Sequence, residues 1–212
     1  MFILNLVDLT LNDFAETTAS DSPAPGGGSV SALAGALGAA LTSMVCALTV
    51  GKKKYADVWD LATDTRSKAL AIEKRCLEII DLDTQAFNGV SAVFAMPKDT
   101  EEQKCARKAA MQKALKGCTE TPIEMMRLSG EALELVESVQ GKLNSGAASD
   151  LGCAVLALKA SMQGAWLNVL INIGGIEDAE FAGKYRAEGE KILEKSLPLA
   201  DRLYSGILES LK

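Results

Sequence analysis

One carboxylate in this sequence has the surroundings that proton-transfer chemistry requires. None of the 212 residues is a histidine, so acid/base chemistry must use carboxylates, lysine, tyrosine, cysteine or bound water. Asp83, in the segment DLDTQAF, is expected on a helix among apolar neighbours. Such surroundings raise the pKa of a carboxyl group and suit it to general acid or base catalysis. The alternative is an exposed aspartate on an amphipathic helix.

A glycine-rich segment and a lysine cluster flank one predicted helix. Gly26, Gly27 and Gly28 precede Ser29 and leave backbone amides bare where the helix begins, which suits an anion. The segment has neither the P-loop pattern nor the preceding strand of a dinucleotide-binding fingerprint, and a tight turn against another helix is the alternative. The lysines at the far end either complement the helix dipole as solvated side chains or bind an anionic substrate tail. They are Lys52, Lys53 and Lys54.

Polar residues also interrupt the apolar C-terminal half. Asn144 lies in a predicted loop, and Ser149 or Asp150 is expected to cap the helix that follows. Asn168 and Asn172 are four residues apart and therefore share one helix face. Because buried amides need hydrogen-bond partners, this pair either joins helices or faces a ligand.

The cysteines indicate a reducing environment. There are five, an odd number, and none forms a CxxC pair. Without histidine a zinc site is not expected, and no other metal is predicted. The pattern is typical of reduced thiols in a cytoplasmic protein. A catalytic cysteine is the alternative, but it would have no histidine to activate it.

The elements that position these residues are predicted to be helices only. Hydrophobic residues make up 48% of the chain and aromatic residues 5%, which favours close-packed helices over a β-sandwich. We predict an all-α fold, a single multihelical domain over residues 1–212. It has about seven helices, expected at residues 4–15, 29–50, 55–95, 100–116, 121–139, 150–173 and 178–211.

Charge and hydropathy limit the partners. The net charge of −6 includes no large basic excess, which argues against nucleic acid binding. Residues 29–50 carry no charge and are long enough to span a bilayer. They are dominated by alanine, glycine, serine and threonine, so we interpret them as a buried helix, with no membrane partner and no signal peptide. The chain has several helices with almost no charged residues, and together they have more apolar surface than one bundle can bury. We therefore predict a partner subunit.

The order of these segments resembles a known family. PAPGGGSVSALAGALGAALTSMV, followed by LTVGKKKY, is similar to the signature of the formimidoyltetrahydrofolate cyclodeaminase family, which also contains stand-alone methenyltetrahydrofolate cyclohydrolases. The resemblance continues through DLDTQAF, MPKDTEEQK and SDLGCAVLALKASMQGAWLNVLINI, so it runs from near residue 19 to near residue 178.

The resemblance implies an interlocked homodimer that uses no metal or prosthetic group. It implies a tetrahydrofolate derivative as substrate and release of ammonia from 5-formimidoyltetrahydrofolate to give 5,10-methenyltetrahydrofolate. Conversion of the methenyl to the 10-formyl form is the alternative reaction. The third possibility is a helical dimer that binds folate without catalysis. If ammonia is the product, a separate formiminotransferase must supply the substrate, because the chain is too short to contain both domains.

The resemblance also assigns roles. Asp83 and Asp150 become the candidates for acid/base catalysis, with Asn144, Asn168 and Asn172 orienting the pterin or the one-carbon unit. The glutamate end of folate is assigned to the glycine segment and two lysines, namely Gly26, Gly27, Gly28, Lys52 and Lys53. Ser29 is expected among the substrate-binding residues.

This sequence departs from the family pattern at three places. Leu143 and Gly146 stand where many relatives have a glycine and a second asparagine in the loop before Ser149. Phe87 replaces a tyrosine of the acidic-aromatic block, so a role for a tyrosine hydroxyl at that position is lost.

Overall fold

The computed structural model describes residues 5–212, and all regular structure within this range is helical. Five long α-helices and one short one account for most of the chain, and three short 3-10 helices lie before or between them. The α-helices are α1 (Leu11–Thr18), α2 (Gly27–Ala47), α3 (Trp59–Phe94), α4 (Glu101–Val139), α5 (Ala148–Ile173) and α6 (Ala179–Ser210). The 3-10 helices are η1 (Leu6–Asp8), η2 (Lys53–Val58) and η3 (Ser145–Ala147).

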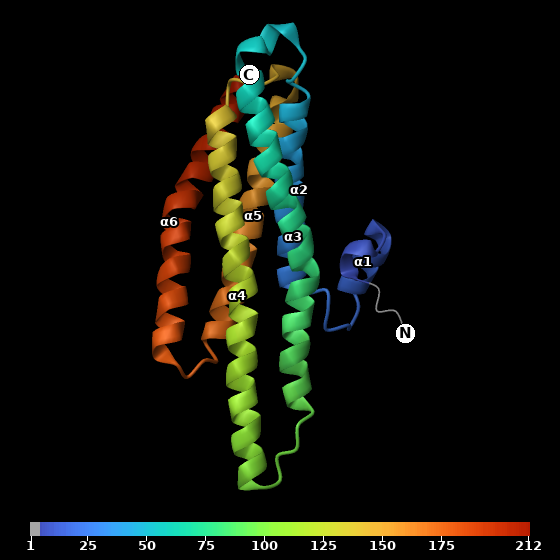
Figure 1. Ribbon diagram of the computed structural model, residues 1–212, viewed down its shortest axis with the longest axis vertical. Coiled ribbons are helices and arrows are strands. Elements are labelled where there is room, and N and C mark those ends of the chain that lie inside the picture. Colours follow the sequence, from blue (N-terminus) through green and yellow to red (C-terminus); the bar gives the residue numbers. More distant parts are fainter. Residues whose placement is uncertain (1–4) are drawn as a thin grey trace.

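Four of the long helices form one bundle. Helix α2 packs between α3 and α5, α4 completes the bundle against α3 and α5, and α6 lies on the outside of α4 and α5. Figure 1 shows that α3 and α4 form a long hairpin extending past the start of α2, and that α1 projects to one side. The prediction of a single all-helical domain is confirmed.

Six α-helices are present in the described range where about seven were predicted, because the expected break before Pro122 does not exist. Helix α4 continues through this proline. Pro122 has no N–H to bond the carbonyl four residues earlier, that of Cys118. The Nδ2 group of Asn172 donates to this carbonyl instead, at 2.8 Å. A side chain from another helix thus compensates for the missing backbone hydrogen bond, which no local pattern indicates.

Small residues, among them Ser31 and Gly35 of α2, allow α2 and α5 to lie close together in antiparallel orientation. A Cβ on Gly35 would lie 2.8 Å from Oγ of Ser161, and a Cβ on Gly164 would lie 2.2 Å from Oγ of Ser31. The backbones are therefore closer than larger residues would permit. These small residues thus permit a tight helix contact within the chain.

Two helix starts differ from the prediction. Helix α5 begins at Ala148 with Ala147 as its N-cap, and no side chain caps it, so neither Ser149 nor Asp150 has the expected role. Helix α2 begins at Gly27, so two of the three glycines belong to its first turn. Leu4, predicted in the first helix, lies outside the described residues.

The predicted apolar face of the N-terminal segment is only partly buried. Phe14 is buried, whereas Leu11 is 79% exposed on α1. The contact of this segment with the bundle includes the backbone N–H of Leu6, which donates to Oδ1 of Asp81 at 2.6 Å.

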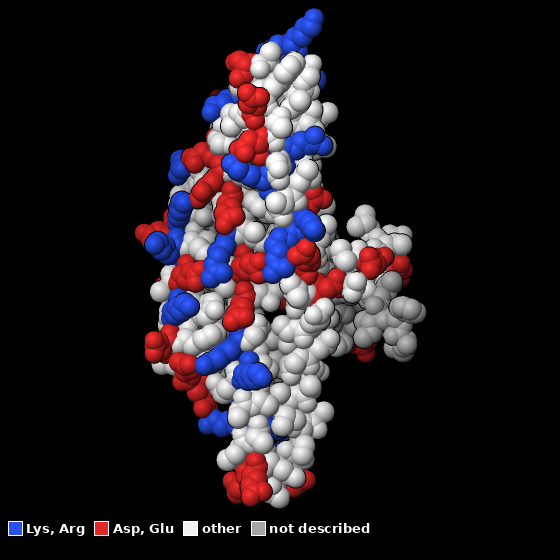
Figure 2. Space-filling view, in the orientation of Figure 1, with Lys and Arg blue, Asp and Glu red and all other residues white. Residues whose placement is uncertain are grey.

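By length and composition, Gly27–Ala47 and Ser145–Ile173 would each suffice to cross a membrane. In the bundle they pack against each other and against helices whose outer surfaces carry many charges (Figure 2). This arrangement agrees with the interpretation of residues 29–50 as a buried helix.

Candidate functional site

Residues from four helices surround one cavity of about 390 Å³. The cavity lies where α2 begins and α5 ends. Its walls contain six of the residues singled out from the sequence, namely Gly26, Gly27, Gly28, Asp83, Asn168 and Asn172. Its volume is within the range of about 300–1,000 Å³ typical of small-molecule sites.

Asp83 is the charged side chain of this cavity, and α3 holds it against the first turn of α2. The hydroxyl of Ser29 donates to its Oδ2 at 3.2 Å and contacts the Ile80 carbonyl at 3.1 Å. Burial raises the pKa of Asp83, and hydrogen bonds from the hydroxyl and backbone of Ser29 oppose this shift. The structure thus gives Asp83 the surroundings that the sequence predicted.

Ser29 has a different neighbour from the one expected. It was predicted to bind the substrate, but it is fully buried and its hydroxyl is directed at Asp83 and the α3 backbone. Gly28 leaves space for the same carboxylate, because a side chain at this position would collide with it. The glycine segment therefore makes room for a carboxylate of the chain itself.

Asn168 and Asn172 lie on the face of α5 that borders the cavity. The Nδ2 group of Asn168 donates to the Gly164 carbonyl at 2.8 Å, and that of Asn172 donates to the Cys118 carbonyl. One N–H of each amide is thus bonded to backbone, and each amide also has a carbonyl oxygen that can accept a hydrogen bond. The sequence left two interpretations open for this pair, a link between helices or a position facing a ligand. Asn172 fits both, because it bonds to α4 and also lines the cavity.

The rest of the cavity wall is largely apolar. Phe87, Val90 and Phe94 contribute from α3, and Cys118 contributes from α4. Burial raises the pKa of the Cys118 thiol to about 11, so it is protonated near neutral pH and is a poor nucleophile. The sequence did not single out Cys118 or Thr84, because their place in the wall depends on how α3 and α4 pair.

The remaining predicted site residues lie at the opposite end of α2. Lys52 and Lys53 are exposed beside η2, and Asp150 is half-buried in the first turn of α5. The 21 residues of α2 separate this end from the cavity by about 30 Å. A single chain therefore does not bring Asp83 and Asp150 together.

Asn144 joins the segments at this second end. Its backbone N–H donates to Oγ1 of Thr49 at 3.0 Å, its Nδ2 donates to the Leu48 carbonyl at 3.3 Å, and its Oδ1 accepts from the N–H of Gly146 at 3.2 Å. These bonds fix the loop before α5 to the end of α2. Positioning of that loop is the role that the geometry gives to Asn144.

Tyr55 belongs to the same end and was not among the predicted site residues. Its hydroxyl accepts from the backbone N–H of Ser145 at 3.1 Å and is 3.3 Å from the serine hydroxyl. Hydrogen bonds from Ser145, with a further contribution from Lys54, lower the pKa of Tyr55 to about 8. The sequence shows a tyrosine after three lysines, but the contact across 90 residues was not predictable from it.

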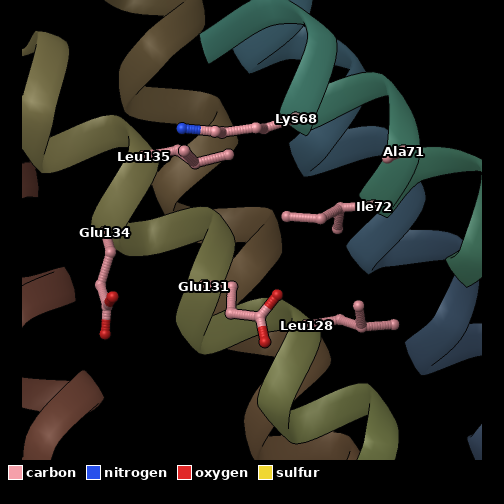
Figure 3. Close-up of a pocket in the computed structure, with 7 residues that line it drawn as sticks. All are labelled: Lys68, Ala71, Ile72, Leu128, Glu131, Glu134 and Leu135. Carbon is pink, nitrogen blue, oxygen red and sulfur yellow. The ribbon is translucent and has the colours of Figure 1, made fainter. Parts of the chain in front are cut away.

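A second groove, of about 480 Å³, lies between α3 and α4 (Figure 3). Lys68 and Ile72 of α3 face Leu128 and Glu131 of α4, while Glu134 points away from them. Lys68 is ion-paired to Asp64 with both side chains 59% exposed. These charges are paired and exposed to solvent, whereas the carboxylate of Asp83 is buried, so the cavity around Asp83 is the better candidate.

The fold and the cavity define a class of protein before any comparison. It is a small helical domain that offers a buried carboxylate and two amide oxygens to a ligand with an apolar, planar part. Such a site can remove a proton from a polar reactant and return it nearby, because a raised pKa suits a carboxyl group to both accepting and donating a proton.

Comparison with known proteins identifies the family. The sequence model of the formiminotransferase-cyclodeaminase family matches residues 10–191. The methenyltetrahydrofolate cyclohydrolase of Methylorubrum extorquens is 39% identical over 198 residues, which cover 93% of this chain and 95% of that protein. The rat formimidoyltransferase-cyclodeaminase is 31% identical over 212 residues, which cover 98% of this chain and 38% of that protein.

A solved structure is similar along its whole length. The formiminotetrahydrofolate cyclodeaminase from Thermotoga maritima superimposes with a TM-score of 0.79 at 27% identity, covering 96% of each chain. This chain therefore belongs to the formiminotransferase-cyclodeaminase family and is an enzyme of folate one-carbon chemistry. The resemblance noted in the sequence is confirmed, whereas the exact reaction is a separate question.

Proposed function

We propose that this enzyme acts on the one-carbon unit that bridges N5 and N10 of tetrahydrofolate, and that it hydrolyses the 5,10-methenyl form to the 10-formyl form. The observation that carries the general proposal is the buried Asp83 carboxylate in a cavity with two amide acceptors. The hydrolytic reaction is favoured by the 39% identity, over nearly the whole of both chains, to a protein named methenyltetrahydrofolate cyclohydrolase.

Asp83 would move the protons of this reaction. Water adds to the bridging carbon and loses a proton to the carboxylate as the C–O bond forms. The C–N5 bond then breaks, the electron pair stays on N5, and the protonated carboxyl group returns a proton to that nitrogen. The hydroxyl of the intermediate loses its proton as the formyl group on N10 forms. A raised pKa suits one carboxyl group to act in both directions.

The amide oxygens would hold the pterin. Its amino and N–H groups are donors, and the side-chain carbonyl oxygens of Asn168 and Asn172 can accept from them, while one N–H of each amide bonds to backbone. The apolar wall that includes Phe87 and Phe94 offers a surface for the ring. This arrangement would fix the one-carbon unit relative to Asp83.

The second candidate is the cyclodeaminase reaction, favoured by the whole-length similarity to the Thermotoga protein of that name. Here N10 attacks the formimidoyl carbon and loses a proton, and the leaving nitrogen gains one and departs as ammonia. The same carboxyl group can accept the first proton and donate the second. The cavity therefore supports either reaction.

Assays of the purified protein with each folate distinguish the two. Loss of methenyl absorbance without ammonia supports hydrolysis. Appearance of methenyl absorbance with stoichiometric ammonia from the formimidoyl substrate supports cyclodeamination instead. If neither change occurs while a folate binds, the chain is a non-catalytic folate-binding protein and the proposal fails.

We also propose that the enzyme is a homodimer. The neighbouring helices α2 and α5 both carry exposed apolar side chains, and the surface that these form is here called the α2–α5 face. Its largest members are Val30, Leu37, Met44, Leu156, Leu167 and Ile171. The face is about 30 Å long and about two helix widths across, or about 600 Å² per copy. Two copies would bury about 1,200 Å², which reaches the range of stable interfaces.

The molecular mass in solution tests the dimer. Leu37, 53% exposed near the middle of the face, is replaced by glutamate. We expect the Leu37→Glu protein to be monomeric by light scattering while the wild type is dimeric. Leu208→Glu, on α6, is the control and should remain dimeric. A wild-type protein that is monomeric at micromolar concentration would contradict the proposal.

A further inference from the structure

The hydroxyl of Ser29 lies within bonding distance of two acceptors on α3. Its Oγ is 3.2 Å from Oδ2 of Asp83 and 3.1 Å from the backbone carbonyl oxygen of Ile80. A serine hydroxyl carries a single hydrogen, so it can donate fully to only one of these acceptors at a time. The structure therefore holds two alternative hydrogen bonds for one donor, beside the carboxylate that the proposed reaction uses.

The better acceptor depends on the protonation state of Asp83. An ionised carboxylate accepts a stronger hydrogen bond than a neutral carbonyl does, so the hydroxyl should donate to Asp83 while that side chain is charged. Once the carboxyl group is protonated, this advantage is lost. A proton on Oδ2 makes that oxygen a donor to Oγ of Ser29, and the serine hydrogen then has to turn to Ile80.

The carbonyl of Ile80 can take or release this hydrogen without being left unpaired. Ile80 lies within α3, where its carbonyl oxygen is positioned to accept the helical bond from the backbone N–H of Thr84. A carbonyl oxygen has two lone pairs, so the serine hydroxyl is a second donor to it. Loss of the serine bond therefore costs less than leaving a buried group with no partner.

The hydroxyl itself is shielded from water. Ser29 is fully buried, and its contact with the Ile80 carbonyl is buried as well. The hydroxyl of Thr84, 3.4 Å from that of Ser29, is a third and longer contact. Because buried polar groups need partners, groups of the chain itself have to satisfy the Ser29 hydroxyl in both protonation states of Asp83.

Few titratable or charged groups surround Asp83. Helix α2 contains no charged residue, and the residues of α5 that line the cavity are neutral. Helix α4 contributes the thiol of Cys118, which is protonated near neutral pH because burial raises its pKa to about 11. A change in the charge of Asp83 therefore acts first on Ser29, which contacts the carboxylate directly.

We propose that Ser29 is a positioning residue whose hydroxyl turns its hydrogen between Asp83 and the Ile80 carbonyl as Asp83 loses and gains the proton of the reaction. The serine hydrogen stays on its own oxygen throughout, and the proton that moves is exchanged between the reactant and the carboxyl group. Directed at Oδ2, the hydroxyl stabilises the carboxylate as a base. Directed at Ile80, it leaves its oxygen as an acceptor for the protonated carboxyl group. This inference rests on the proposed role of Asp83 in folate chemistry.

The carbonyl carbon of Ile80 can report the direction of the hydroxyl. Aspartate follows isoleucine at one place in the sequence, where Asp81 follows Ile80. Cell-free synthesis with carbonyl-¹³C isoleucine and ¹⁵N aspartate therefore gives a single resonance in an amide–carbonyl correlation spectrum. This resonance is followed from pH 4 to 8 in the wild type, in Ser29→Ala and in Asp83→Asn, without substrate.

In the wild type the Ile80 resonance should move along a titration curve, because protonation of Asp83 turns the hydroxyl toward this carbonyl. The midpoint should coincide with the pH at which kcat/KM declines. The same step should be absent from Ser29→Ala and from Asp83→Asn. Titration of Asp81, which adjoins Ile80, can also move the resonance, but that contribution is common to all three proteins.

The kinetics of Ser29→Ala separate positioning from a structural role. Without the hydroxyl bond to the ionised carboxylate, the acidic decline of kcat/KM should move to higher pH by about one unit, since a bond to a charged group contributes on this scale. Ser43→Ala is the control, because it removes another buried hydroxyl from α2, about 21 Å further along the helix. Its pH profile should match that of the wild type.

Failure of the hydroxyl exchange can be told apart from failure of the folate activity. A wild-type Ile80 resonance that does not respond at the pH where kcat/KM declines overturns the proposal. An equal response in Ser29→Ala, or an unchanged pH profile of that variant, overturns it as well. If Ser29→Ala does not fold, the wild type and Asp83→Asn still decide, because residue 29 is the same in both. An enzyme without turnover contradicts the folate activity instead, whereas the Ile80 titration needs no substrate.

Discussion

A methyl group on Gly28 would lie 2.2 Å from Oδ1 of Asp83, so the absence of a side chain at residue 28 leaves the space in which this carboxylate sits. The two residues come from different helices, α2 and α3, and are 55 positions apart in the chain. The glycine and the aspartate therefore act as one structural unit.

Gly28→Ala should displace Asp83 while leaving both helices intact. A contact of this length cannot persist, and the carboxylate must rotate away from Ser29. We expect kcat to fall by about 10²-fold, because small misplacements of a reacting group have effects of this size. Gly89→Ala is the control, since a Cβ there meets nothing within 4 Å. Equal activity of both variants would contradict the dependence of Asp83 on Gly28.

Asp83→Asn should retain the fold and lose the reaction. The amide has nearly the same shape but cannot exchange a proton, so kcat should fall by about 10²–10⁴-fold. Circular dichroism and the oligomeric state should be unchanged. A variant that folds and keeps near-normal turnover would remove Asp83 from the mechanism.

The pH dependence of kcat/KM should report the raised pKa of Asp83. Because burial favours the neutral carboxyl group, the ionised base is lost at a higher pH than the ordinary aspartate value of about 3.9. Activity should therefore decline as the pH falls through this raised pKa. Measurements of kcat and kcat/KM from pH 4 to 8 give the pH at which activity declines. A decline centred at or below the ordinary aspartate pKa would contradict the burial argument.

The stability of the wild type should change with pH in the opposite direction to its activity. A raised pKa in the folded state means that the contribution of Asp83 to stability is greatest below the unfolded pKa and is lost as the pH rises through the folded pKa. Asp83→Asn should therefore gain stability over the wild type as the pH rises. Urea unfolding of both proteins at pH 4 and pH 8 gives the comparison.

Asn172 and Pro122 should be coupled energetically. Asn172→Leu leaves the Cys118 carbonyl without its donor, and we expect a loss of about 1–3 kcal/mol in the free energy of unfolding. Adding Pro122→Ala restores a backbone N–H at the correct position, so the double variant should recover much of this loss. Activity should not recover, because the amide oxygen that borders the cavity is still absent. Additive effects on stability would contradict the coupling.

Gly38→Ala should weaken the contact between α2 and α5. The added Cβ would lie 2.7 Å from Cγ of Leu158 and 3.0 Å from the Ala154 carbonyl oxygen, and the backbone atom cannot rotate away. Overpacking of this kind costs about 1–3 kcal/mol. Gly117→Ala in α4 meets no neighbour and should be neutral or stabilising by thermal unfolding.

The fold was largely predictable because helical periodicity and capping are local. The capping box of Thr100 and Gln103, for example, begins α4 where the sequence indicated. The break predicted at Pro122 failed because its compensation comes from Asn172, 50 residues away. Local patterns do not report such contacts.

The candidate site was predictable in its residue types and less so in its arrangement. Asp83, Asn168 and Asn172 were singled out from helix position and polarity, and they do meet in one cavity. The distance between Asp83 and Asp150 depends on the direction of α2, and the role of Ser29 depends on which helix faces it. Both are properties of the packed bundle.

The absence of basic residues before Lys52 has a practical consequence for protein chemistry. Trypsin cleaves only after lysine and arginine, so α1, the glycine segment and all of α2 remain in one fragment. The earliest cleavage points are three adjacent ones at the start of η2. Brief digestion of the native enzyme, with and without folate, therefore reads the accessibility of that end directly from the appearance of a single large N-terminal peptide.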